Sequence, residues 1–113
     1  MSAVPTASID AAAEWLRKHF APEATRGVRA TFLLDLTGAG GGLLRVEVDD
    51  GSLLIARGRG APPQVVLRAP TALWCAVLAG RENAELLYMA GRIQIDGDLG
   101  LAAKLRSFFG RRA

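Results

Sequence analysis

Residues 28–57 carry the stretch VRATFLLDLTGAGGGLLRVEVDDGSLLIAR, which decides the fold. Between residues 28 and 36 an apolar side chain occupies every second position. This pattern is typical of a half-buried β-strand, because successive side chains point to opposite faces. The apolar face of this strand carries Val28, Ala30, Phe32, Leu34 and Leu36. The other face is expected to meet solvent and carries Arg29, Thr31, Leu33 and Asp35.

Two turns follow this strand and lead into a second and a third strand. The glycine-rich segment 38–42 turns the chain into a second alternating strand over residues 44–48. Asp50-Gly51 is a tight-turn signal, because these residue types tolerate the positive φ angles of short hairpins. A third strand follows over residues 53–57. The three strands are therefore predicted to form an antiparallel meander.

The segments that flank the meander predict helices and two further strands. Ser8 can cap a helix that runs to about Phe20. Beyond the meander, the pattern predicts a strand at 64–68, helices at 71–79 and 83–90, a strand at 92–96, and a helix at 99–109 capped by Asp98. Because alternating strands have one solvated face, all helices should cover the other face. The sequence therefore predicts a two-layer α+β fold.

The chain has 113 residues, a length that suits one domain. We expect residues 8–110 to form this domain, residues 1–7 to be a flexible leader and residues 111–113 to be a basic tail. No secretory signal is visible at the N-terminus. The uncharged run 69–80 is too short to cross a bilayer, which needs about 20 residues. A cytoplasmic location is therefore expected.

The basic residues leave a formal net charge of +3. Most arginines are scattered along the chain, and only Arg106, Arg111 and Arg112 are clustered, near the C-terminus. A nucleic-acid binder would concentrate its charge and interleave aromatic side chains, so no nucleic-acid partner is expected. The bases of the tail could instead touch anionic lipid headgroups transiently.

No catalytic or metal-binding set is apparent in the sequence. The glycine cluster is followed by a strand and lacks the Gly-Lys-Ser/Thr of a phosphate loop, which favours a hairpin loop. His19 and Cys75 are the only residues of their types, and neither has a partner at a spacing typical of catalysis or zinc binding. Asp96 and Asp98 are interpreted as a strand end and a helix cap. We predict no catalytic residue, no metal and no cofactor.

What remains is apolar surface on the sheet and on the helices that oppose it. These side chains could fill a plain core or line a cavity for a hydrophobic ligand, and periodicity leaves both alternatives open. The candidate ligand-binding residues are Phe32, Leu34, Val46, Val48, Ile55, Leu67, Leu73, Trp74, Val77, Leu86, Met89, Ile93, Ile95, Leu101, Leu105, Phe108 and Phe109.

A succession of segments resembles the sterol-carrier-protein-2 family over about residues 9–109. The most specific segment is YMAGRIQIDGDL at 88–99, which is similar to the family's pattern of a methionine, a glycine, a basic residue, an alternating strand and Gly-Asp. The stretch AAKL at 102–105 is also similar to the family. Earlier segments that share the resemblance are 32–38, 48–55 and 70–83. Their order and spacing together carry the resemblance.

The resemblance implies a five-stranded, mostly antiparallel sheet with helices on one face and an apolar tunnel between the layers. It implies a non-catalytic carrier of sterol-like lipids, fatty acyl chains or acyl-CoA, phospholipids, or polyprenylated quinone precursors. The candidate residues would line the tunnel, and the last helix would be the gate. The chain resembles a small stand-alone bacterial member, because the C-terminus lacks a peroxisomal signal and arginine far exceeds lysine.

Two hypotheses about function remain. The first is the carrier of a hydrophobic small molecule or lipid. The alternative is a protein-interaction or accessory module of the same fold with a filled core, supporting a lipid or quinone biosynthetic complex. An exposed apolar edge would permit a homodimer under either hypothesis. A cavity between sheet and helices distinguishes the two, because only the carrier requires one.

Overall fold

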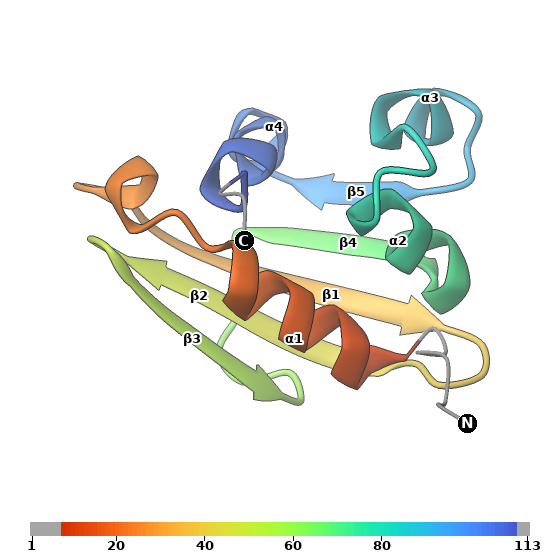
Figure 1. Ribbon diagram of the computed structural model, residues 1–113, viewed down its shortest axis with the longest axis horizontal. Helices are drawn as coiled ribbons and strands as arrows, with labels where there is room; N and C mark the ends of the chain where they lie inside the picture. The colour runs from red at the N-terminus through yellow and green to blue at the C-terminus, as the bar shows by residue number, and fades with distance from the viewer. Residues whose placement is uncertain (1–7, 111–113) are drawn as a thin grey trace.

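The fold is built around a five-stranded sheet with helices packed against it (Figure 1). The computed structural model describes residues 8–110. In chain order its elements are α1 (Ile9–His19), the 3-10 helix η1 (Pro22–Thr25), β1 (Arg29–Thr37), β2 (Gly42–Asp49), β3 (Ser52–Arg57), β4 (Val65–Pro70), α2 (Thr71–Leu78), α3 (Ala84–Met89), β5 (Gln94–Gly97) and α4 (Leu99–Phe108).

The strands follow the order β3-β2-β1-β4-β5 across the sheet. Antiparallel ladders join β1 to β2, β2 to β3 and β4 to β5, whereas β1 and β4 run parallel. Phe32 at the centre of β1 lies opposite Val46 of β2 and Val65 of β4. The predicted α+β class with a mostly antiparallel sheet is confirmed, and the meander forms three of its five strands.

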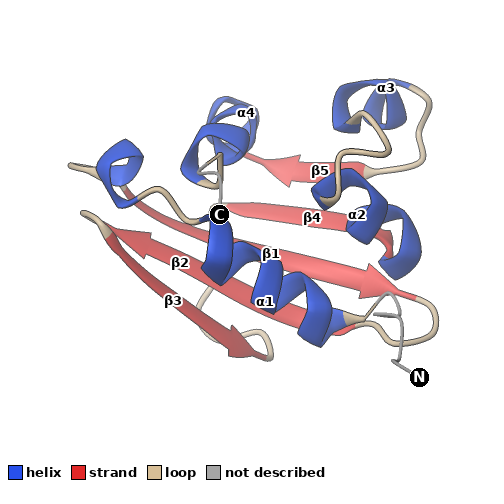
Figure 2. Ribbon diagram, viewed as in Figure 1, coloured by secondary structure: helices blue, strands red, loops and turns tan. Residues whose placement is uncertain are grey.

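Helix α1 forms because its sequence combines a cap with an apolar stripe. The Ser8 Oγ accepts a hydrogen bond from the Ala11 N–H at 3.0 Å, as the sequence predicts. Figure 2 shows α1 lying across the strands of the meander. The side chains that α1 buries recur at helical spacing and are Ile9, Ala12, Ala13 and Leu16.

Helix α4 closes the core with two aromatic residues at its C-terminal end. The Phe108 ring meets the Phe32 ring edge-on, with 6.3 Å between the centroids. The neighbouring Phe109 packs against Phe20, which follows α1, at 5.6 Å. The contacts of α4 therefore tie the central strand to the end of the first helix.

The far face of the sheet is less exposed than the alternation predicts. Leu33 points away from the helices, and yet 0% of its surface is exposed. Its neighbours in the ladders are Arg45 and Val66. The connection from β3 to β4 crosses this face, because a Cβ atom added at Gly60 would collide with the Arg45 guanidinium. The expectation of a solvated Leu33 is therefore wrong, since the crossing connection covers the middle of the face.

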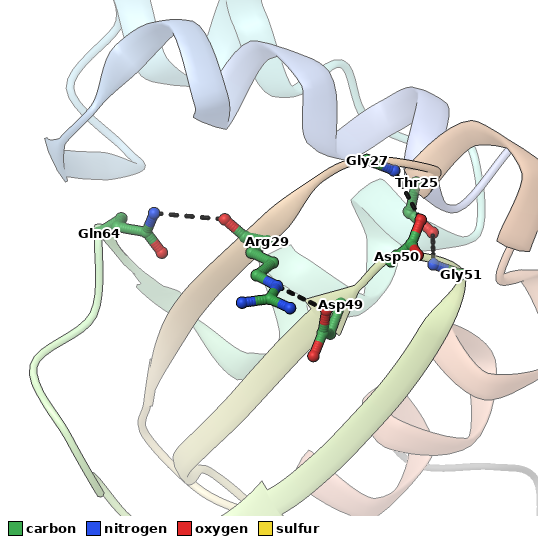
Figure 3. A network of polar contacts seen from close by, with 7 residues as sticks. All are labelled: Thr25, Gly27, Arg29, Asp49, Asp50, Gly51 and Gln64. Atoms are coloured by element: carbon green, nitrogen blue, oxygen red, sulfur yellow. Dashed lines mark hydrogen bonds and ion pairs between the residues drawn. The ribbon is translucent and has the colours of Figure 1, made fainter.

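A polar network ties the short helix η1 to the β2–β3 turn (Figure 3). The buried Thr25 Oγ1 donates to the Pro22 carbonyl at 2.9 Å and accepts from the Gly51 N–H at 3.1 Å. The Asp50 carboxylate accepts from the Gly27 N–H at 2.8 Å. Asp50 has a φ of 46°, a left-handed conformation that aspartate adopts more readily than most residues other than glycine. These bonds fix the predicted turn against the segment that precedes β1.

Candidate ligand-binding cavity

A cavity of about 950 Å³ lies between the β4–β5 side of the sheet and the helices α2, α3 and α4. Figure 1 shows these elements together on the side of the molecule away from β3. Small-molecule sites in proteins usually have about 300–1,000 Å³, so this volume is large enough for a lipid-sized ligand. No residue of β1, β2 or β3 lines the cavity within residues 8–110.

The interior of the cavity is apolar. The floor is formed by Leu67 of β4 and by Ile93, which immediately precedes β5. Trp74 of α2 and Phe109 at the end of α4 form buried walls. Half-buried aliphatic side chains complete the surface, and these are Val77, Leu78, Ile95 and Leu105. An interior of this kind favours hydrocarbon over water.

The mouth of the cavity is polar and charged. Arg81, Glu82 and Asn83, between α2 and α3, are exposed and line the opening. Arg106 of α4 and Glu85 of α3 face one another there, with 3.9 Å between Nη2 and Oε1. Both side chains are largely exposed, so solvent screens the pair and it contributes little to stability. The arrangement suits an amphiphile whose polar end stays at the opening.

Helix α1 contributes an aromatic pair to the same region. Trp15 lines the cavity, and the His19 ring stacks on it with 3.9 Å between the centroids. The His19 Nδ1 lies 2.9 Å from the Trp15 carbonyl oxygen, as the i,i+4 spacing on a helix allows. The stack holds the Trp15 ring at the cavity wall. Both tryptophans of the chain, Trp15 and Trp74, therefore line this cavity.

Part of the candidate set is brought together at this cavity. The members that line it come from β4, α2, β5 with its preceding turn, and the end of α4, all of which border the β4–β5 side of the sheet. They are Leu67, Trp74, Val77, Ile93, Ile95, Leu105 and Phe109.

The remaining candidates lie elsewhere. Those on the meander and at the end of α4 are fully buried in the core beneath α1 and α4: Phe32, Leu34, Val46, Val48 and Phe108. Leu73 and Leu101 are half-buried against that core. Leu86 and Met89 of α3 point to solvent and are 64% and 80% exposed. Alternation identifies the apolar face of a strand, but it does not say which helix covers that face.

Ile55 of β3 lines a second, smaller hollow of about 280 Å³ beside α1. Its other walls include Asp10, Glu14 and Arg17 of α1. Arg57 and Asp10 form an ion pair there. Charged walls on this scale do not suit an apolar ligand.

Several lining residues were absent from the candidate set. Trp15 and Leu16 of α1 both line the cavity, although no residue of this helix was a candidate. Tyr88 of α3 and Leu99 of α4 line the mouth and are 41% and 52% exposed. Large apolar side chains that stay exposed near helix ends indicate an opening. The sequence does not show which side chains are exposed, so it could not identify these residues.

Within residues 8–110, no three side chains of the His, Cys, Asp or Glu type are grouped closely enough to hold a metal ion. None of the helices in the same range combines the length and apolar composition needed to cross a bilayer.

Solved structures of other proteins share this fold. A palmitated SCP2L2 from Aedes aegypti superimposes with a TM-score of 0.72 at 24% identity, over 93% of this chain and 96% of that chain. A UbiJ-SCP2 ubiquinone synthesis protein superimposes with a TM-score of 0.61 at 11% identity, over 79% of this chain and 74% of that chain. At these identities the likeness shows the fold alone.

One further match is to part of a much longer enzyme. The inverting sec-alkylsulfatase Pisa1 from Pseudomonas sp. has a TM-score of 0.70 at 18% identity, over 84% of this chain. The match covers 14% of the sulfatase, so this chain spans about one seventh of that enzyme's length. The shared fold therefore also occurs as a component of a larger protein.

Sequence comparison assigns the family. No curated protein matches the chain. Residues 12–110, which include every strand and most of α1, match the pattern of the SCP-2 sterol transfer family. The resemblance noted in the sequence is confirmed over almost the same range. The chain belongs to the SCP-2 sterol transfer family.

Proposed function

We propose that the protein is a non-catalytic carrier that binds one hydrophobic ligand in the 950 Å³ cavity and transfers it. The observation that carries this proposal is the combination of an apolar interior with a charged mouth. The candidate ligands are a sterol-like lipid, a fatty acyl chain or acyl-CoA, a phospholipid, and a polyprenylated quinone precursor. The palmitated insect relative and the UbiJ-SCP2 ubiquinone synthesis protein support the acyl and quinone classes.

The affinity of such a site comes mainly from removing hydrocarbon from water. Each buried methylene contributes about 0.8 kcal/mol before the costs of association are subtracted. The arginines at the mouth, Arg81 and Arg106, can pair with an anionic end group that stays solvated. An apolar slot discriminates weakly between chains of similar length, at about 1–3 kcal/mol per methylene.

The experiment that tests this proposal is native mass spectrometry, followed by solvent extraction of the purified protein. We expect a lipid or quinone precursor to accompany the protein at near one-to-one stoichiometry. After delipidation, a fatty acid should shift the intrinsic fluorescence, because Trp15 and Trp74 both line the cavity. If the mass stays that of the bare chain after incubation with fatty acid, sterol and polyprenyl compounds, the interaction module becomes the better account.

Transfer requires contact with the membranes that hold the ligand, and we propose that α3 makes this contact. Leu86 and Met89 lie three residues apart, on one face of α3, and both are largely exposed. Leu87 is the one buried side chain of α3 within the described chain, so the helix is lightly attached beside the cavity mouth. Exposed apolar groups on a short helix insert into the headgroup boundary of a bilayer.

Replacing both Leu86 and Met89 with aspartate should slow ligand transfer between phosphatidylcholine vesicles by about tenfold, because the face that enters the lipid is lost. Affinity for a fluorescent fatty acid in solution should change by less than about twofold, since neither side chain lines the cavity. The matched control is Leu54→Asp, on an exposed position of β3 that is remote from the mouth. Equal transfer rates in the double variant and the control would rule out α3 as the contact.

The sequence also predicts that the basic tail, residues 111–113, touches anionic lipid headgroups. This tail and the predicted leader at residues 1–7 lie outside the described residues. The boundaries of the carrier domain at 8–110, the cytoplasmic location, the bacterial origin and the homodimer stay predictions.

A further inference from the structure

The ion pair between α3 and α4 occupies one of the two cations at the mouth of the cavity. Arg106 lines the mouth and follows Leu105, which lines the apolar interior. A chain buried beside Leu105 would therefore bring its polar end close to this arginine. The Arg106 Nη2 already lies 3.9 Å from the Glu85 Oε1. An anionic ligand thus meets a cation that an acid of the protein holds.

The charges at the mouth balance in number but differ in their pairing. Arg81 and Arg106 supply two cations, and Glu82 and Glu85 supply two acids. Within residues 8–110, neither Arg81 nor Glu82 forms an ion pair. The side chains of Glu85 and Arg106 are 81% and 73% exposed, so their pair is weak. A ligand carboxylate can displace Glu85, at a cost that an uncharged end group does not meet.

We propose that Glu85 is a specificity-determining residue of the carrier, because it competes with anionic ligands for Arg106. A carboxylate must displace Glu85 to reach the guanidinium, and the displaced acid stays nearby and repels it. An alcohol gains little from the cation and loses little to the acid. Glu85 thus shifts the preference of the mouth toward ligands with an uncharged polar end. This inference rests on the proposed carrier function and narrows its ligand class.

The test compares dodecanoate with dodecanol, which share a chain and differ in the end group. Each is titrated into the delipidated full chain at low salt and about pH 8, where the carboxylate is ionised. The fluorescence of Trp15 and Trp74, which line the cavity, reports binding. Glu85→Gln should tighten dodecanoate binding about twofold to fivefold, the range set by exposed ion pairs, and leave dodecanol binding unchanged. High salt should reduce the gain, because the groups are exposed.

Two further variants separate competition from a change in net charge. Glu14→Gln on α1 removes an acid that is also 81% exposed and also pairs with an arginine, but that does not line this cavity. It should leave both affinities unchanged. In an Arg106→Gln background, the gain from Glu85→Gln should fall below about 1.5-fold, because no cation remains there to compete for. Circular dichroism shows whether each variant is folded.

The two proposals fail in different ways. If neither dodecanoate nor dodecanol binds, the carrier function falls and this inference falls with it. If the ligands bind but Glu85→Gln changes both affinities equally or changes neither, the carrier function stands and the role of Glu85 is overturned. The same holds if the gain persists in full without Arg106, because the acid would then act by simple repulsion.

Discussion

Phe32→Ala is expected to lower the free energy of unfolding by about 3–5 kcal/mol, the usual cost of deleting a buried aromatic ring. Phe32 is 1% exposed on the central strand, and its ring contacts Phe108 of α4. The substitution leaves a void between the sheet and α4 that neighbouring side chains fill only in part. Urea unfolding followed by circular dichroism measures this change.

A surface position supplies the control for this variant. Leu54 of β3 is 51% exposed, so Leu54→Ala should change stability by no more than about 0.5 kcal/mol. The milder Phe32→Leu should retain the affinity for a fluorescent fatty acid, since Phe32 does not line the cavity. A loss of binding in a well-folded Phe32→Leu protein would show instead that the ligand reaches the central strand.

Leu105→Glu is expected to weaken ligand binding by more than about a hundredfold. Leu105 lines the cavity from α4, and a carboxylate there must either lose its hydration or bring water into the apolar interior. A hundredfold change corresponds to about 2.7 kcal/mol, which lies at the low end of such costs. Titration with a fluorescent fatty acid measures the affinity, and circular dichroism shows whether the variant is folded.

Leu101→Glu is the matched control, because Leu101 lies one turn earlier on α4, is also half-buried, and does not line the cavity. Its cost should appear as reduced stability, with an affinity within about threefold of wild type. If the two folded variants lose affinity equally, the position of the cavity along α4 is misassigned.

Local signals in the sequence predict most of the fold. The alternation from Val28 to Leu36 and the Asp50-Gly51 turn predict the meander, and Ser8 and Asp98 both cap helices as expected. The parallel pairing of β1 with β4 was not predictable, because it depends on where a connection crosses the sheet. The burial of Leu33 has the same origin, since local alternation cannot anticipate a loop from another part of the chain.

The cavity is harder to predict than the fold. Leu101 and Leu105 share an apolar helix face, yet only Leu105 lines the cavity. The same contrast separates Leu73 from Val77 on α2. Periodicity shows which side of a helix or strand is apolar. Whether the space beside that side is a packed core or a cavity depends on the distance to the neighbouring elements, which is set by the packing of the whole domain.

Most residues that line the cavity lie in two segments. One connects β4 to β5 and contains α2 and α3, and the other is the C-terminal segment from Leu99 onward. The meander supplies the core beneath α1 and no lining within the described chain. Insertions or substitutions in the segment between β4 and β5 can therefore change the size of the cavity while the scaffold stays intact. Under the proposed carrier function, such a division would let one scaffold acquire new ligands mainly through changes in the C-terminal half of the chain.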